Sequence, residues 1–338
     1  MTQSHPLQHK RNPLLLDSRA PKWLITPLPH DAVTVNNPMF RVDLRGLPTA
    51  DELRRKTRRR MGMIVGGFGL IWLFMAMLIL FSNEITAEYW FRFAGRMIAY
   101  LFMASLADKF LFDFIGIAGG LNLIRSDVTQ GRWDLLNLTA LPTSYIVASK
   151  QAVAEINGWN ALTIVMGVRL SVVVLVILHL IVLPIIMSMT GHVFLRDNVL
   201  NFNDIFINTT TSAFILGVFL ALLSAAYVYV VEPRWRLRAL AAAGVSYSAQ
   251  KRDISLSMLS GMSAFLQIWM AQVFMAVGAF VMLFLSQVIA LLGTLGVIFG
   301  GVLYIVAVGI FIHATYQGMA QSWMNKTWRT LYKRRGVF

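Results

Sequence analysis

Six long apolar stretches constrain the fold of this chain more than any other feature. A helix rises 1.5 Å per residue, so about 20 apolar residues cross a hydrocarbon core of roughly 30 Å. The six stretches occupy residues 61–82, 97–122, 160–188, 207–231, 260–287 and 294–316. They predict an all-α integral membrane protein with six transmembrane helices.

The composition excludes the soluble and the disordered classes. Hydrophobic residues make up 57% of the 338 residues and charged residues 14%, against about 45–50% and about 25% in soluble domains. A disordered chain is poor in the large apolar residues that abound here. The chain has no cysteine, which excludes disulfide frameworks and cysteine-ligated metal sites.

Basic residues alternate in number between the segments that connect the stretches. One set of segments holds nineteen Lys and Arg, whereas the other set holds three. The rich segments are 51–60, 123–158, 233–258 and 317–338, and the poor ones are 83–96 and 190–206. Because cytoplasmic loops carry the excess of Lys and Arg, this pattern predicts a multi-pass protein of the cell membrane with both termini in the cytoplasm. The basic runs then anchor lipid headgroups, and we expect no nucleic-acid partner for the net charge of +14.

The chain divides into an extension, a membrane domain and a tail. Residues 1–48 hold seven of the ten prolines, which predicts an irregular polar cytoplasmic extension. Thr49 and Glu52 have the spacing of a capping box, so an amphipathic N-terminal helix should begin there and continue into the first stretch. Residues 49–316 form the predicted six-helix domain, and 317–338 a basic cytoplasmic tail.

Two further patterns concern how the helices break and pack. Residues 260–316 are almost continuously apolar, and only Leu291 to Thr294 offer a turn between the last two spans. Pairs of glycines four residues apart predict faces at which helices pack closely. These pairs are Gly62 and Gly66, Gly116 and Gly120, and Gly296 and Gly300.

Charged residues inside the spans are candidates for function, because a charge at the bilayer centre costs at least about 2.5–3.5 kcal/mol. The intramembrane polar residues are Asp108, Lys109, Asp113, Arg169 and His179. Lys109 and Asp113 are four residues apart and can pair on one helical face. The set is either a polar pathway through the membrane or a group of paired charges that orient the bundle.

Motifs for enzymatic chemistry are absent from the sequence. There is no G-x-x-x-x-G-K-[ST] loop, no H-E-x-x-H and no G-x-S-x-G. The six histidines are scattered, and the acidic residues do not gather into a metal-binding cluster. We therefore expect no catalytic residues, no metal site and no cofactor on this chain.

The segment after the second stretch contains a short amphipathic pattern. Trp133, Leu135, Leu136 and Leu138 have helical spacing and predict a short helix with an apolar stripe on the cytoplasmic side. Pro142 would end this helix. Such a helix either lies on the lipid surface or docks into the groove of a partner.

This segment resembles the equivalent loop of the ABC-2 type transporter permeases. The matching positions are Asp127, Gly131, Asp134, Leu135, Leu136, Thr139 and Lys150, while Arg132-Trp133 and the late Pro142 depart from the family pattern. The resemblance implies the permease subunit of an ABC exporter that uses separate ATPase subunits and dimerises with a second permease subunit. ATP and Mg would bind to the ATPase, and the segment from Gly131 to Pro142 would be the coupling helix. Trp133 and Leu136 would then bury themselves in the ATPase.

Two other functions fit the same sequence. The chain could be a non-transporting membrane anchor or scaffold subunit of a larger complex. It could also be an ion-coupled carrier that uses Asp108, Lys109 and Asp113, although no inverted repeat is visible. All three readings include membrane lipids as partners.

Overall fold

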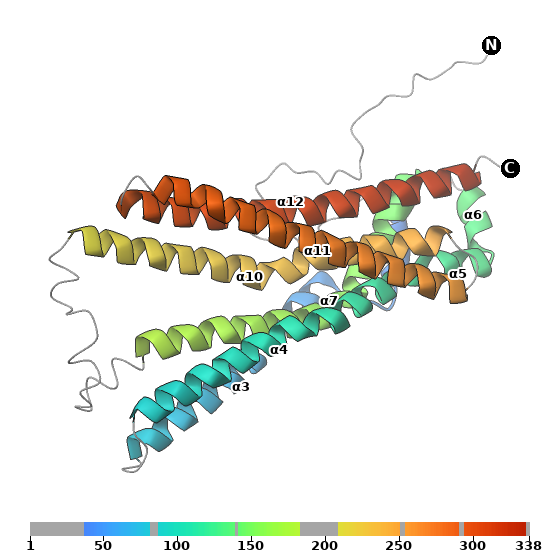
Figure 1. Cartoon of the computed structure of the whole chain (residues 1–338). Coiled ribbons are helices and arrows are strands. Elements are labelled where there is room, and N and C mark those ends of the chain that lie inside the picture. Colours follow the sequence, from blue (N-terminus) through green and yellow to red (C-terminus); the bar gives the residue numbers. More distant parts are fainter. Residues whose placement is uncertain are drawn as a thin grey trace.

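The computed structural model describes residues 37–81, 87–138, 141–182, 209–250, 254–290 and 294–335 (Figure 1). Every regular element in these ranges is a helix, which confirms the predicted all-α class. The long helices are α3 (Ala50–Phe81), α4 (Ala87–Leu121), α7 (Thr143–Ile177), α10 (Thr209–Gln250), α11 (Ile254–Ala290) and α12 (Thr294–Arg335). The short ones are α2 (Pro38–Asp43), α5 (Leu123–Thr129), α6 (Arg132–Leu138) and the π-helical η1 (Leu178–Val182).

Four helical stretches are long and apolar enough to cross a membrane, so the chain is a multi-pass membrane protein. They are Ala50–Leu78, Thr143–Leu180, Gly261–Leu283 and Gly300–Lys333. The predicted stretch 97–122 lies largely within α4, where Asp108, Lys109 and Asp113 interrupt the apolar sequence. The predicted stretch 207–231 begins outside the described residues and ends within α10.

Local signals place two helix boundaries where the sequence predicts them. The Thr49 amide donates to Oε2 of Glu52 at 3.2 Å, and the Glu52 amide donates to Oγ1 of Thr49 at 3.3 Å. This reciprocal capping box opens α3, which continues without interruption to Phe81. At the other boundary, α11 ends at Ala290 and α12 begins at Thr294. Both predictions are confirmed.

The described part of the N-terminal extension is ordered rather than irregular. Asn37 caps α2 by accepting from the Met39 amide at 3.0 Å, and Pro38 occupies the first turn, where its missing N–H costs nothing. Phe40 is buried against Ala152 and Ile156. The expectation of an irregular extension is therefore wrong for Pro38–Asp43, which form a helix that packs on α7.

The long helices form two groups that converge at one end of the molecule. Figure 1 shows α3, α4 and α7 on one side and α10, α11 and α12 on the other, with the groups spreading apart away from α5 and α6. At the convergent end Leu240, Ala241 and Ala243 of α10 are fully buried in the main hydrophobic core. Small side chains in this part of α10 let the neighbouring helices approach closely.

Two segments predicted to be cytoplasmic contribute residues to this core. The predicted loop 233–258 is helical as far as Gln250, and Arg236 within it is 0% exposed. The predicted tail 317–338 continues α12 to Arg335, with Trp323 and Leu331 buried. Both segments therefore continue long helices for as far as the structure describes them, and their predicted cytoplasmic side stays a prediction.

The close crossing of α4 and α10 depends on glycine. A Cβ atom at Gly120 would lie 2.7 Å from the Val245 backbone nitrogen, and one at Gly244 would lie 2.3 Å from the Ile117 carbonyl oxygen. The packing predicted for Gly116 and Gly120 is confirmed. By contrast, a Cβ atom at Gly62 would meet nothing within 4 Å, so that glycine packs against no helix in the part of the chain that the structure describes.

We predict that Gly244→Ala destabilises the protein by about 1–3 kcal/mol, because the added methyl group must displace backbone rather than a flexible side chain. Gly62→Ala is the matched control, and it should be neutral or stabilising by up to about 1 kcal/mol, since alanine favours a helix over glycine. Thermal unfolding of the two purified variants in detergent is the measurement. Equal stability of the two variants would contradict the close crossing.

Candidate functional site: a buried ionic network

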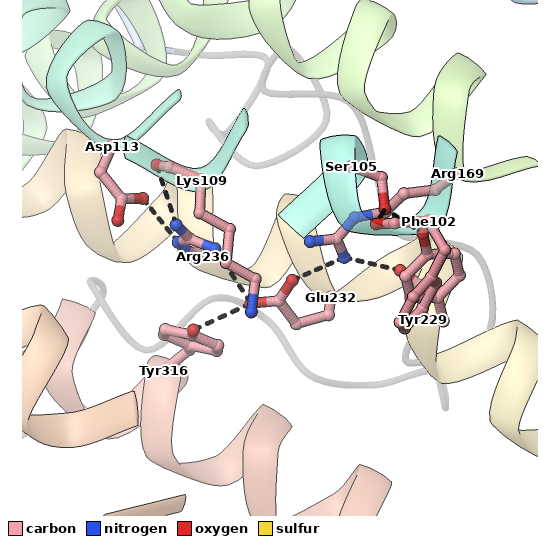
Figure 2. A network of polar contacts seen from close by, with 9 residues as sticks. All are labelled: Phe102, Ser105, Lys109, Asp113, Arg169, Tyr229, Glu232, Arg236 and Tyr316. Carbon is pink, nitrogen blue, oxygen red and sulfur yellow. Dashed lines mark hydrogen bonds and ion pairs between the residues drawn. The ribbon is translucent and has the colours of Figure 1, made fainter. Parts of the chain in front are cut away.

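An arginine and an aspartate from different helix groups form the centre of a buried network (Figure 2). Nε of Arg236 on α10 donates to Oδ1 of Asp113 on α4 at 2.5 Å, and both side chains are fully buried. Nη2 of Arg236 also donates to the Lys109 carbonyl oxygen at 3.1 Å. Arg236 thus links α10 to two successive turns of α4.

Glu232 extends the network to two further helices. Its Oε2 accepts a hydrogen bond from Nη1 of Arg169 on α7 at 2.8 Å, and its Oε1 accepts one from the Tyr316 hydroxyl on α12 at 2.9 Å. Nη1 of Arg236 lies 3.6 Å from Oε1 of the same carboxylate. Four helices are therefore joined through two carboxylates and two guanidinium groups.

A proline explains part of this arrangement. Pro233 lies inside α10 and has no N–H, so the Tyr229 carbonyl one turn earlier loses its usual helical donor. Nη1 of Arg169 donates to that carbonyl oxygen at 2.7 Å. The guanidinium carbon of Arg169 also lies 4.9 Å from the centre of the Tyr229 ring, which adds a cation–π contact. Arg169 thus replaces the bond that the proline removes.

We predict that Arg169→Met destabilises the protein by about 2–4 kcal/mol, because it removes the hydrogen bonds that Arg169 donates to the Tyr229 carbonyl and to one oxygen of Glu232. Adding Pro233→Ala should restore about 1 kcal/mol or more, since the alanine N–H can donate to Tyr229 again. Thermal unfolding of the single and double variants in detergent tests this. If Pro233→Ala gives no more benefit to Arg169→Met than to the wild-type chain, Arg169 does not satisfy the freed carbonyl.

Two hydroxyl groups add a further link between α4 and α10, close to Arg169. The hydroxyls of Ser105 on α4 and Tyr229 on α10 share a short hydrogen bond. The Ser105 hydroxyl also lies 2.6 Å from the Phe102 carbonyl oxygen. Ser105 is fully buried, so this part of the interface between α4 and α10 is protected from solvent.

The structure corrects the predicted partner of Asp113. Its carboxylate pairs with Arg236 and not with Lys109, although Lys109 is one turn away on the same helix. The predicted pairing is therefore wrong. Asp113 pairs with Arg236, which is 123 residues away in the sequence, and not with the lysine on its own helix.

The other predicted polar residues have different positions. Arg169 belongs to the network, as described above. His179 is buried in η1, about three turns beyond Arg169, where Gly95 of α4 faces its ring. Asp108 lies on α4, and its side chain is outside the described residues. The structure thus brings Lys109, Asp113 and Arg169 together and leaves His179 apart.

A second buried ion cluster holds the short helices at the convergent end. Nζ of Lys150 on α7 lies 2.5 Å from Oδ2 of Asp127 on α5 and 3.0 Å from Oδ1 of Asp43 on α2. The Ser149 hydroxyl donates to the other oxygen of Asp43. The Ser248 hydroxyl of α10 accepts from the backbone amides of Ile124 and Arg125 and so caps the start of α5. α5 is therefore fixed to α7 and α10 directly, and Lys150 also links it to α2.

The predicted amphipathic helix is present as α6, but its exposed face differs from the prediction. Trp133 is only 5% exposed and packs into the main core, so it is not part of an exposed stripe. Leu136 is half-buried against the same core. The exposed apolar residues are Leu135 and Leu138, at 66% and 84%.

The remaining positions of the predicted coupling segment frame α6. Gly131 has a φ angle of +70° in the turn between α5 and α6, a conformation that favours glycine. Asp134 lies on α6 with its side chain outside the described set, and Thr139 lies outside the described residues. Pro142 is the N-cap residue of α7. Two short helices, α5 and α6, thus precede α7 in the sequence and are called the α5–α6 hairpin below.

The network joins four helices through ion pairs and hydrogen bonds. Among the described residues no group of three or more His, Asp or Glu is placed to hold a metal ion.

Sequence reasoning missed Glu232, Arg236, Tyr229 and Tyr316. Two of them fall in a predicted loop or at its edge, and the tyrosines look like ordinary membrane aromatics. The signal that could have found Glu232 is Pro233, which follows it inside a helical pattern and frees a carbonyl group.

Comparison of the chain with known protein families, characterised proteins and solved structures found no match.

Proposed function

We propose that the chain is the permease subunit of an ATP-driven ABC transporter of the ABC-2 type, an exporter of the cell membrane. Separate ATPase subunits would bind ATP and Mg, and a second permease subunit would complete the transport unit. The observation that carries this proposal is the α5–α6 hairpin, which presents Leu135 and Leu138 outward on a base fixed by buried ion pairs.

In this proposal all six long helices cross the membrane. The set adds α4 and α10 to the four candidates of sufficient length and apolarity. The apolar run in α4 is interrupted by charges, and Asp113 among them has a buried partner, which reduces its cost in a membrane. Both termini and the convergent end would then be cytoplasmic, as the excess of basic residues on that side favours.

A continuous path connects the hairpin to the ionic network. Lys150, which holds the hairpin, and Arg169, which holds Glu232, belong to the same helix α7. They are nineteen residues apart, which corresponds to about 28 Å along the helix. A displacement of α5–α6 by an ATPase would therefore move α7 and act on the contacts between the two helix groups.

We predict that Leu135→Asp combined with Leu138→Asp weakens ATPase binding at least about thirtyfold while the stability of the permease changes by less than about 0.5 kcal/mol. Both side chains are exposed, so their loss removes partner contacts and no internal packing. The measurement is co-purification of the permease with a candidate ATPase subunit, such as one whose reading frame lies beside the gene, together with thermal unfolding of the permease.

Trp133→Ala provides the contrasting control. Because Trp133 is buried in the core, this change should destabilise the permease itself by about 3–5 kcal/mol. Full ATPase association and full ATP hydrolysis by the leucine double variant would refute the coupling role of α6. Stable association without any cargo-dependent ATP hydrolysis in the wild-type complex would instead favour the anchor or scaffold function.

A further inference from the structure

We propose that the exposed basic face of α3, formed by Arg54, Arg55, Arg58 and Arg59, binds the phosphate headgroups of anionic phospholipids. These four arginines and Asp51 line one hollow at the start of the helix. The proposal concerns a lipid site and does not depend on whether the chain transports cargo.

One face of α3 is fixed against α7, which determines what the other face can reach. Leu53 is buried, and Oγ1 of Thr57 accepts from Nε1 of Trp159 at 2.8 Å. Nη1 of Arg60 donates to Oδ1 of Asn160 at 2.7 Å. These three residues follow one another at spacings of four and three, so they form a single stripe toward α7. The four arginines of the basic face lie outside this stripe and are exposed.

The arginines are arranged in two neighbouring rows. Arg54 and Arg58 are four residues apart, as are Arg55 and Arg59, so each pair stacks like charges on the helix surface. Among the described residues Arg55, Arg58 and Arg59 have no carboxylate partner. Asp51 lies 3.7 Å from Arg54, but its side chain is 95% exposed, and such surface pairs contribute little.

This arrangement disfavours the helix unless an anion is present. Positive charges near a helix N-terminus oppose the helix dipole, and like charges four residues apart repel each other. The capping box formed by Thr49 and Glu52 offsets only the start of the helix. An anionic ligand between the two rows would remove the repulsion, which indicates what the exposed face is suited to bind.

The position of the face selects membrane lipid over a soluble anion. The same unbroken helix enters its apolar part at Met61, so the four arginines lie within about 3–10 Å of that boundary along the helix axis. The headgroup layer on each side of a bilayer is about 5–8 Å thick. The guanidinium groups are therefore at the level of the lipid phosphates, where arginine forms bidentate hydrogen bonds.

The experiment uses the full chain in nanodiscs of phosphatidylcholine and phosphatidylglycerol. Gly62→Cys gives one labelling site in a chain without cysteine, one turn from Arg58, and a side chain there meets nothing within 4 Å. A fluorophore on this cysteine is quenched by brominated lipid of either type. We expect brominated phosphatidylglycerol to quench at least about fivefold more effectively per mole than brominated phosphatidylcholine. The attraction of one basic residue to an anionic surface raises the local concentration of anionic lipid by about that factor.

Three variants of the labelled chain make the result specific. Replacing the four arginines with glutamine should abolish the preference, whereas replacing them with lysine should keep most of it. Replacing Lys326, Arg329 and Lys333 of α12 with glutamine removes exposed charge elsewhere and should leave the preference unchanged. If the fourfold glutamine variant does not fold, Arg54→Gln with Arg58→Gln removes one row and should reduce the preference by half or more.

Several results would overturn the proposal. The first is a wild-type chain that shows no preference for phosphatidylglycerol. The second is a glutamine variant, fourfold or double, that keeps the full preference. The third is loss of the preference in millimolar inorganic phosphate at constant ionic strength, which would identify a site for soluble phosphate instead of lipid.

Discussion

Replacing Arg236 with methionine is expected to destabilise the protein by about 3–5 kcal/mol, the largest effect of any single change in the network. The substitution leaves the Asp113 carboxylate fully buried and without its guanidinium partner. Glu232 suffers less, because it keeps its hydrogen bonds from Arg169 and Tyr316. The stranded charge on Asp113 therefore causes most of the loss.

The double variant Arg236→Met with Asp113→Leu distinguishes the effect of leaving one buried charge unpaired from the effect of replacing the whole ion pair with apolar side chains. Replacing a whole buried pair by apolar side chains is often nearly neutral, so the double variant should be markedly more stable than Arg236→Met alone. Thermal unfolding of the wild-type chain and the three variants in detergent completes the cycle. Strictly additive losses would show that the two side chains do not interact.

The same cycle distinguishes the two interpretations of the intramembrane charges. A double variant that folds but has lost transport would favour a polar pathway. A double variant that folds and transports would leave the pair as a device that orients α4 against α10. Transport is measured on the reconstituted complex with its ATPase, so the result also depends on the proposed function.

Replacing Lys150 with methionine is expected to cost about 3–5 kcal/mol and to release the short helices from α7. Lys150 is the cation between Asp43 and Asp127, and the three side chains are only 6%, 11% and 8% exposed. Without the ammonium group two carboxylates face each other in a buried site. We expect α2 and α5 to separate from α7 before the long helices unfold.

Hydrogen exchange measures this release directly. In Lys150→Met the backbone amides of α2 and α5 should exchange at least about a hundredfold faster, while those of α11 should be unchanged. Lys150→Met combined with Asp127→Leu is the control, because Asp43 keeps its bond from Ser149 and no second charge remains beside it. Unchanged exchange in α2 of the single variant would show that Lys150 does not hold the extension.

The sequence by itself determined the features that depend on residues within a turn or two of each other. The long apolar stretches require helices, because a bilayer offers no other partner for their backbone groups. Thr49 and Glu52 set the start of α3, and the break after Ala290 separates α11 from α12. Spacing also predicted α6, since Trp133 and the leucines that follow it repeat with the period of a helix.

Only the tertiary structure decided which residues meet. Arg236 and Asp113 are 123 residues apart, and Arg169 and Glu232 are 63 apart, so no local pattern contains either pair. The basic residues of 233–258 predict a cytoplasmic segment, but they do not predict that a carboxylate from α4 neutralises Arg236 inside the core. Trp133 has the spacing of an exposed stripe, and its burial depends on where α6 packs. A helix presents several faces, and which of them is covered is set by neighbours that the linear sequence does not name.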